Sequence, residues 1–247
     1  MITKADIQLV RSLADKRSRD EMGLFVAEGE KLIEEIRSSS LRIRRIFALD
    51  GVLQGADVER ATAKEMERLS HLKTPSSCVA LVEIPRYALK TENLTGRLTL
   101  ALDDVQNPGN MGTIIRLADW FGISDIVCSL STADCFNPKV IQATMGAILR
   151  VRVHYTDLTH FLEEMQRAGE PIYGTLLDGE NIYKCDLSPH GVVVMGNEGR
   201  GIRPATERFI DHRLLIPPYP ASRHGSESLN VAVATAVACA EFRRRVL

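Results

Sequence analysis

A strand, a turn-rich segment and a helix are expected between residues 98 and 122, and this stretch constrains the fold more than any other. It opens with the apolar run Leu98–Leu102, which is typical of a buried strand. A cluster of turn residues follows in 107–112, and then apolar residues recur at helical spacing from Ile114 until Gly122 ends the pattern. Open α/β proteins bind ligands at a loop of this kind, which predicts a site here.

Arg116 is the unusual residue of this stretch. With a helix expected over Gly112–Phe121, it lies near the first turn, where the helix dipole favours anions over cations. Such an arginine is a candidate to hold a phosphate or a hydroxyl group. A solvated surface arginine is the alternative interpretation.

The rest of the second half alternates in the same way. Strands are expected over 98–105, 125–130, 150–155, 171–177, 191–195 and 212–216, and helices over 138–149, 158–168, 204–209 and 229–245. The run Gly191–Met195 is fully apolar, which predicts a central strand. The last helix is rich in alanine and valine on nearly all sides, so we expect it to be buried against the sheet or another chain. This alternation predicts an α/β fold with a parallel sheet.

The first half predicts a smaller α/β unit. A basic amphipathic helix is expected over 4–19, with further helices over 30–37 and 63–69. Strands are expected over 24–29, 42–49 and 78–84, with a weak one at Val58. The predicted domains are therefore residues 1–90 and 98–247, joined by a linker at 91–97.

Composition excludes few classes of function. The formal net charge of −1 over 247 residues does not by itself indicate a nucleic-acid-binding protein. The five cysteines are odd in number and widely spaced, without zinc-site spacing, so we expect reduced thiols, no metal and a cytoplasmic location. No stretch of about 18 residues is continuously apolar, so no membrane span is expected.

Three glycine- or proline-rich breaks each follow an apolar strand, at 107–112, 196–201 and 217–228. Loops that follow parallel strands share one edge of a sheet, so these three can form one site. Neither a dinucleotide fingerprint nor a P-loop is present. The residues there that can take part in chemistry are Asn110, Arg116, Glu198, Ser228 and Asn230. Each also has a structural interpretation, as a turn residue or a helix cap such as Ser228 before the last helix.

Three ordered segments resemble the motifs of the SpoU/TrmH family of RNA ribose 2′-O-methyltransferases, which belongs to the SPOUT superfamily. They are Asn-Pro-Gly-Asn-Met-Gly-Thr-Ile-Ile-Arg (107–116), Met-Gly-Asn-Glu-Gly-Arg-Gly-Ile (195–202) and Ser-Leu-Asn-Val-Ala-Val-Ala (228–234). Their order and spacing are more specific than any one of them. Residues 1–90, with Phe-Val-Ala-Glu-Gly (25–29), resemble the L30e-like RNA-binding domain that precedes the catalytic domain in many members.

The resemblance implies a parallel-sheet methyltransferase domain with a C-terminal trefoil knot and a homodimer formed through that domain. It implies S-adenosyl-L-methionine as cofactor, held largely by main-chain groups. Carried over to this chain, the cofactor-binding residues are Gly196, Asn197, Gly199, Ile216, Pro217, Ser228 and Leu229.

The implied reaction is methyl transfer to a ribose 2′-hydroxyl, with ribosomal RNA favoured over transfer RNA. In this assignment Arg116, aided by a substrate phosphate, orients the hydroxyl, and Asn110 fixes Arg116. Glu198, Ser228 and Asn230 complete the catalytic group, partly across the dimer.

The third motif departs from the family pattern. Pro218–Glu227 is longer and richer in proline than usual, and Val231-Ala232 replaces Val-Ser. An RNA-binding protein that kept the fold without turnover is therefore an alternative. The others are a transfer-RNA 2′-O-methyltransferase and a methyltransferase for a base or a small molecule.

Overall fold

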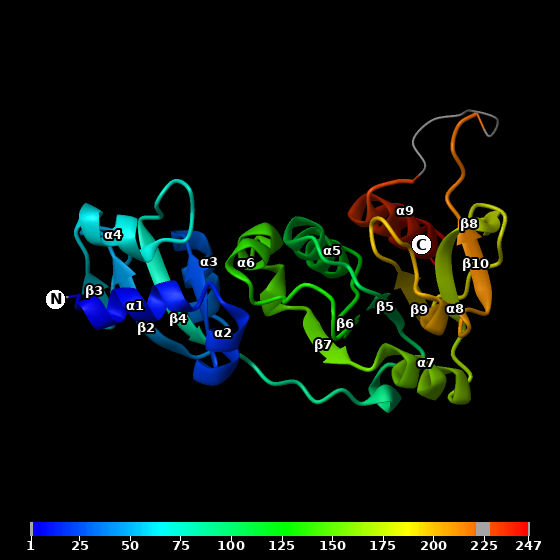
Figure 1. Ribbon diagram of the computed structural model, residues 1–247, viewed down its shortest axis with the longest axis horizontal. Coiled ribbons are helices and arrows are strands. Elements are labelled where there is room, and N and C mark those ends of the chain that lie inside the picture. The colour runs from blue at the N-terminus through cyan, green and yellow to red at the C-terminus, as the bar shows by residue number, and fades with distance from the viewer. Residues whose placement is uncertain (1, 221–227, 247) are drawn as a thin grey trace. The chain divides into compact units, whose positions relative to one another are not determined.

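The computed structural model describes residues 2–220 and 228–246, which divide into two compact units (Figure 1). The first comprises residues 2–86 together with 134–149, and the second comprises 87–133 with the described part of 150–246. The α-helices are α1 (Lys4–Ser12), α2 (Lys16–Met22), α3 (Glu30–Arg37), α4 (Ala63–Leu69), α5 (Pro108–Trp120), α6 (Pro138–Thr144), α7 (Leu158–Arg167), α8 (Pro204–Glu207) and α9 (Val231–Arg244). The strands are β1 (Leu24–Glu28), β2 (Ile43–Ala48), β3 (Val58–Arg60), β4 (Cys78–Glu83), β5 (Leu98–Leu102), β6 (Asp125–Ser129), β7 (Arg152–Thr156), β8 (Ile172–Asn181), β9 (Gly191–Met195) and β10 (His212–Leu215). Short 3₁₀ turns occur at η1 (Thr91–Asn93) and η2 (Ala147–Leu149).

The first unit is built on a mixed four-stranded sheet in the order β1-β4-β2-β3. β4 pairs antiparallel with β1 and β2, and β3 pairs parallel with β2. α1 and α4 pack together and bury Val10 and Met66 against Val26, Phe47 and other apolar residues of the sheet. The expected small α/β unit is thus present.

The basic helix expected over 4–19 is two helices. α1 ends at Ser12, and Asp15 begins α2 by accepting a hydrogen bond from the backbone N–H of Ser18. An aspartate in extended conformation caps a helix better than it continues one, so the chain restarts there. The prediction of one continuous helix was wrong for this reason.

Residues 134–149 lie in the first unit although they come between β6 and β7 in sequence. The buried guanidinium of Arg19 forms an ion pair with Asp134 at 2.5 Å and also donates to the carbonyls of Leu13 and Ala14. The ring of Phe136 lies 5.0 Å from that of Phe25 on β1. This segment therefore completes the core of the first unit.

The helix expected over 138–149 ends early. α6 stops at Thr144 because Met145 takes a left-handed conformation at φ 51°, followed by Gly146 at φ 88°. A glycine in this conformation is a common way to end a helix. Only the turn η2 continues the expected helix.

The second unit has a six-stranded sheet in the order β10-β8-β9-β5-β6-β7, and every pairing is parallel. The predicted parallel α/β fold is confirmed, with β9 at the centre. Alternate side chains of the buried strands face opposite sides. α7 covers one side through a cluster that includes Val127, Phe161 and Val194. α5 and α9 cover the other side, where they lie next to each other (Figure 1).

α5 begins four residues earlier than expected. Asn107 caps it by accepting hydrogen bonds from the backbone N–H groups of Gly109 and Asn110, and Pro108 occupies its first turn. Proline suits that position because its missing N–H would have no helical partner there. The turn residues 108–112 are therefore the start of the helix and not a loop.

α9 is capped by Asn230, whose side chain accepts from the N–H groups of Ala232 and Val233, so the alternative interpretation of Ser228 as its cap was wrong. One face of α9 is also left open by the described residues, since Val233 is 50% exposed. The connection through 221–227, which includes most of the proline-rich departure, lies outside the described residues. The trefoil knot stays a prediction for this reason.

No helix among the described residues is long and apolar enough to cross a membrane.

Candidate functional site

The three motif segments meet at the carboxyl edge of the parallel sheet, through one chain of side-chain hydrogen bonds. Asn230, at the start of α9, donates from Nδ2 to Oδ1 of Asn110 at 2.9 Å. Asn110, on α5, donates from its own Nδ2 to Oε1 of Glu198 at 2.8 Å. Each member of the chain comes from a different motif, so these residues fix three distant segments relative to one another.

Glu198 lies in the loop after β9, and this loop is tightly closed. Asn197 and Gly201 exchange backbone hydrogen bonds of 2.9 Å in both directions. The Asn197 side chain accepts from the N–H groups of Gly199 and Arg200, each at 3.0 Å. We refer to residues 196–201 as the closed loop.

Gly196 is required by the close approach of the chain to itself. A Cβ atom at this position would lie 2.3 Å from the carbonyl carbon of Gly201 and 2.4 Å from the nitrogen of Ile202. Any side chain would force these backbone segments apart. The loop is therefore built from residues that let the backbone fold back closely.

Arg116 is exposed on α5 and forms no hydrogen bond or ion pair with any residue in the described ranges. Since α5 starts at Pro108, Arg116 is the ninth residue of the helix and not in its first turn. The dipole argument for its unusual position was therefore wrong, because the dipole effect is confined to the helix ends. Nor is Arg116 joined to Asn110 by a hydrogen bond in this structure.

The remaining predicted residues follow β10 or precede α9. Ile216 and Pro217 are half-buried and come directly after β10, at the same sheet edge as the closed loop. Ser228 and Leu229 are exposed and lie just before the Asn230 cap. No side-chain hydrogen bond links Ser228 to the Asn110 chain among the described residues. The structure thus brings Asn110, Glu198 and Asn230 into direct contact and leaves Arg116 and Ser228 outside that contact.

Sequence reasoning missed two buried carboxylates that lie directly after β5. Asp103 is fully buried, and Asp104 is 6% exposed with its backbone at φ 62°. Hydrogen bonds from Arg203 to Asp103 raise the pKa of that guanidinium. Two consecutive aspartates at the end of an apolar strand were the available signal.

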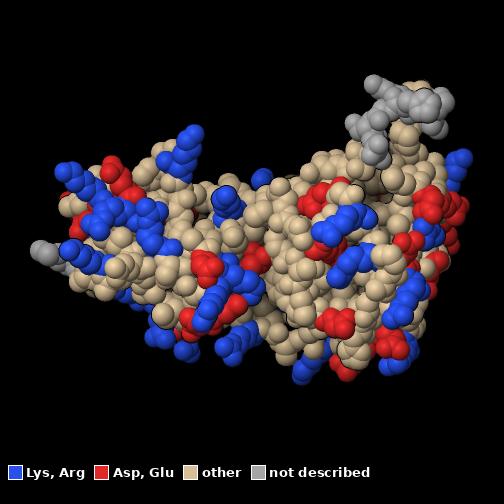
Figure 2. Space-filling model, in the orientation of Figure 1, with Lys and Arg blue, Asp and Glu red and all other residues tan. Residues whose placement is uncertain are grey.

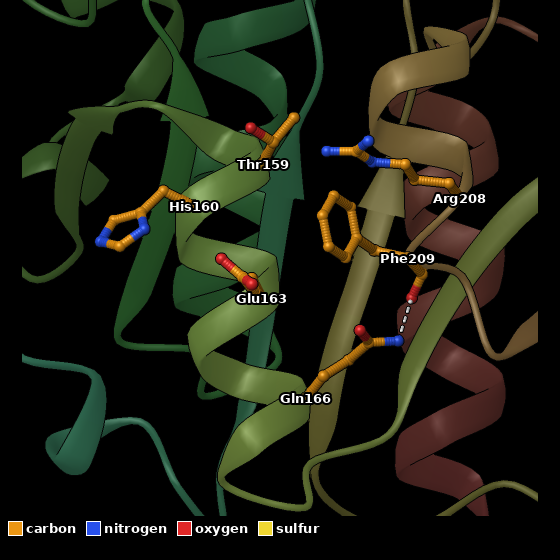
Figure 3. Close-up of a pocket in the computed structure, with 6 residues that line it drawn as sticks. All are labelled: Thr159, His160, Glu163, Gln166, Arg208 and Phe209. Atoms are coloured by element: carbon orange, nitrogen blue, oxygen red, sulfur yellow. Dashed lines mark hydrogen bonds between the residues drawn. The ribbon is translucent and has the colours of Figure 1, made fainter.

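A hollow of about 450 Å³ lies on the α7 side of the same unit, away from the motif residues. Figure 3 shows its lining side chains, with the Gln166 amide donating to the carbonyl of Phe209. The Arg208 guanidinium carbon lies 4.8 Å from the centre of the Phe209 ring. None of the motif side chains lines this hollow, so it gives no support to a catalytic assignment there.

Comparisons with known proteins agree with this arrangement. Residues 97–240 match the model of the SpoU rRNA Methylase family, and residues 4–80 match the MRM3-like substrate binding domain. The 23S rRNA (guanosine(2553)-2'-O)-methyltransferase RlmP of Bacillus subtilis is 32% identical over 92% of this chain and 91% of its own length.

Two solved structures extend the likeness over both units. A TrmH-family structure from Porphyromonas gingivalis is 37% identical, with a TM-score of 0.88 over 99% of each chain. An AdoMet-bound rRNA methyltransferase from Sinorhizobium meliloti is 29% identical, with a TM-score of 0.87 over 100% of this chain and 97% of that one. With its three motifs joined at one sheet edge and its family model matched over more than half of its length, the chain belongs to the SpoU rRNA methylase family.

Proposed function

We propose that this protein transfers a methyl group from S-adenosyl-L-methionine to a ribose 2′-hydroxyl in RNA, with ribosomal RNA as the substrate class. The observation that carries the proposal is the hydrogen-bonded chain Asn230–Asn110–Glu198, which unites the three motifs. Arg116 lies on the same helix as Asn110 and forms no ion pair with any described residue. Relatives over nearly the full length are 23S rRNA 2′-O-methyltransferases, which supports the choice of substrate.

The closed loop and its neighbours suit the cofactor. Gly196 allows the closed loop to fold back on itself, and Gly199 is exposed without a side chain over its main-chain groups. The aliphatic side chains of Ile216 and Leu229 provide apolar surface for an adenosine. Asn197 and Pro217 then shape the ends of this site. When bound, S-adenosyl-L-methionine supplies a methyl group on a positively charged sulfur, so the reaction needs no metal.

Arg116 is the residue we assign to the reacting hydroxyl. A guanidinium keeps its proton at all ordinary pH values, so Arg116 does not act as a base. Its exposed donors, which bond to no described residue, can instead hold a substrate phosphate and stabilise the negative charge that develops on the attacking oxygen. Asn110 acts by holding Glu198 and Asn230, rather than by fixing Arg116 as we expected from the sequence.

We also propose a homodimer formed through the exposed face of α5 and α9. Trp120 is 83% exposed on α5 and Val233 is 50% exposed on α9, and Ala240 is exposed on the same face of α9 as Val233. Apolar side chains gathered on two adjacent helices mark an interaction surface. A second copy covering this face would place both copies of Arg116 near the interface, consistent with an active site completed across the dimer.

The first unit is the proposed RNA-binding part. Figure 2 shows Lys and Arg side chains over α1 and α4, interspersed with acidic ones. Lys4 and Arg11 on α1 and Lys64 and Arg68 on α4 are exposed and form no ion pair with any described residue. Cations that are not already paired are available to phosphates, and binding through them weakens as salt rises.

An action on ribosomal RNA would place the protein in the cytoplasm of a bacterial cell.

The test uses total RNA from cells that lack this protein, purified full-length protein and labelled S-adenosyl-L-methionine. We expect label in large ribosomal RNA, with one position that resists alkaline cleavage because its 2′-hydroxyl is methylated. Label in transfer RNA would keep the chemistry and overturn the substrate class. Label that leaves every position open to alkaline cleavage would indicate a base as the acceptor. Cofactor binding without label in any RNA, including ribosome-assembly precursors, would favour an RNA-binding protein without turnover.

A further inference from the structure

Asp103 is a fully buried carboxylate that holds Arg203, one hundred residues later in the chain. Its Oδ2 accepts a hydrogen bond of 2.8 Å from the backbone N–H of Arg203. Its Oδ1 accepts from Nε of the same residue at 2.7 Å and from a terminal guanidinium nitrogen at 2.5 Å. The carboxylate therefore accepts hydrogen bonds from both the main chain and the side chain of Arg203.

Arg203 comes two residues after the closed loop, so its contact with Asp103 fixes the C-terminal end of the loop. The N-terminal end is fixed at the same place, because Nδ2 of Asn197 donates to the backbone carbonyl of Asp104 at 2.7 Å. Asp103 and Asp104 are consecutive residues at the end of β5. Both ends of the closed loop are thus fastened to one point of the sheet, and Glu198 lies between them.

The backbone contact distinguishes this pair from an ordinary ion pair. A bond to a side chain alone allows the main chain to shift while the long arginine adjusts. A bond to the N–H of Arg203 fixes the main chain itself, next to the segment 196–201 that we assign to the cofactor. The main-chain groups of a site can bind tightly only if they are held in place before the ligand arrives.

We propose that Asp103 and Arg203 are a positioning pair that holds the closed loop in the geometry required for binding S-adenosyl-L-methionine. The inference rests on the proposed function, since it assigns a role in that cofactor site. Neither residue touches the reacting atoms in this assignment. Both act through the loop, so their loss should change cofactor affinity before anything else.

The chain contains a matched control in the same unit. Arg152 donates two hydrogen bonds, of 2.7 and 2.6 Å, to the buried carboxylate of Asp125. The Arg152 side chain is 42% exposed and that of Arg203 is 45% exposed. Asp125 begins β6, whereas Asp103 follows the end of β5, so the two pairs lie at opposite ends of parallel strands. The substitution Arg152→Gln thus removes a comparable ion pair far from the closed loop.

The experiment compares full-length wild type, Arg203→Gln, Arg203→Lys and Arg152→Gln. For each protein, thermal unfolding gives the stability, and calorimetric titration below the melting temperature gives the dissociation constant of S-adenosyl-L-methionine. We expect Arg203→Gln to weaken binding about tenfold, equivalent to ~1.4 kcal/mol. Both substitutions keep the backbone N–H that donates to Asp103 and remove only the guanidinium contacts. The affinity of Arg203→Lys should therefore fall between those of wild type and Arg203→Gln, because lysine keeps a positive charge beside the carboxylate. In steady state, KM for the cofactor should rise while KM for RNA stays unchanged.

Arg152→Gln should lose a similar amount of stability and keep the wild-type dissociation constant. Equal loss of affinity in Arg152→Gln and Arg203→Gln would overturn the inference, because the effect would then be general destabilisation. Unchanged affinity in a folded Arg203→Gln would overturn it as well. A wild type that binds no S-adenosyl-L-methionine would instead refute the proposed function, together with this inference.

Discussion

Asn110 and Glu198 are 88 residues apart in sequence, and the amide of the first donates a 2.8 Å hydrogen bond to the carboxylate of the second. The same Asn110 accepts from Asn230, another 120 residues away. Asn110 therefore has both its donor and its acceptor engaged by other motifs. Removing it should separate the closed loop from the start of α9.

We expect Asn110→Ala to lower kcat by about one to two orders of magnitude, because the groups it aligns would lose their shared geometry. Asn230→Ala should have a similar effect, and the double variant should be little worse than either alone, since both act through one chain of bonds. Methylation rates of the four proteins measure this coupling. Thr113→Ala on the same helix is the control, because its hydroxyl donates to the helix carbonyl of Gly109 and bonds to no other residue in the described ranges. Fully additive losses would show that the two asparagines act separately.

Arg116→Ala should lower the rate of methyl transfer by about 100-fold or more. It should leave the cofactor dissociation constant within twofold of wild type. The reason is that Arg116 is exposed and unpaired among the described residues, so its removal leaves no buried partner behind. Rate measurement and calorimetric titration on the same preparation test both parts. Arg167→Ala serves as the control, since Glu163 on α7 is the one described residue with which Arg167 pairs. Wild-type turnover in Arg116→Ala would refute its assigned role.

The single tryptophan of the chain provides a direct test of the dimer. Trp120 is 83% exposed in one protomer, so its fluorescence should shift to shorter wavelength as dimers form with rising concentration. Val233→Glu should keep the protein monomeric, because the charge would be buried without a partner. Leu177→Glu, at another exposed apolar position of the same unit, should leave the dimer intact. Light scattering gives the mass of each variant, and a monomeric wild type at micromolar concentration would contradict the proposal.

Acid should weaken the end of α9 through Glu241. This carboxylate is 5% exposed, and its hydrogen bonds with Arg244 and Arg245 lower its pKa to about 2. A carboxyl whose pKa is lower in the folded state stabilises the fold above its unfolded pKa, and this contribution is lost as the pH falls from about 4.5 towards 2. Glu241→Gln should therefore be less stable than wild type at pH 7 and show a flatter loss of stability below pH 4.5. The measurement is the free energy of unfolding of both proteins from pH 7 to pH 2. If Glu241 has no such role, the two free energies will fall in parallel as the pH is lowered.

Asp134→Ala should destabilise the first unit by about 3 kcal/mol, because it leaves the guanidinium of Arg19 buried without its carboxylate. The control is Asp20→Ala, which removes an exposed ion pair with Lys16 on α2. Such surface pairs contribute about 0.5 kcal/mol or less. Denaturant unfolding of the two variants gives the difference, and equal stabilities would show that the Arg19 pair is not needed.

Much of the fold was predictable where apolar runs end at glycine, proline or capping residues. The bounds of α3, α4 and β9 agree with the sequence-based expectation, and the parallel order of the second sheet follows from the alternation of strands and helices. Helix starts were harder. Pro108 was interpreted as a loop residue although it also fits the first turn of a helix. Ser228 was given as a cap of the last helix in its structural interpretation, whereas Asn230 is the residue that caps α9.

The candidate site was predictable at the level of motifs but not of contacts. The resemblance identified Asn110, Glu198 and Asn230, and only the three-dimensional arrangement reveals that they bond to each other. The pairing of Asp103 with Arg203 could not be found in the same way, because a buried aspartate and a distant arginine carry no periodic pattern. The roles of the predicted catalytic and cofactor-binding residues stay predictions.

The path of the chain through residues 134–149 bears on how such proteins can be recombined. Because this segment supplies core residues to the first unit, the front part is encoded in two separated stretches of the gene. A shortened protein that begins at the linker would retain Asp134 and Phe136 without Arg19 and Phe25, their partners. Exchange of the front part between relatives would succeed only if both stretches were exchanged together. The two units are therefore expected to be inherited as a pair, and not as interchangeable modules.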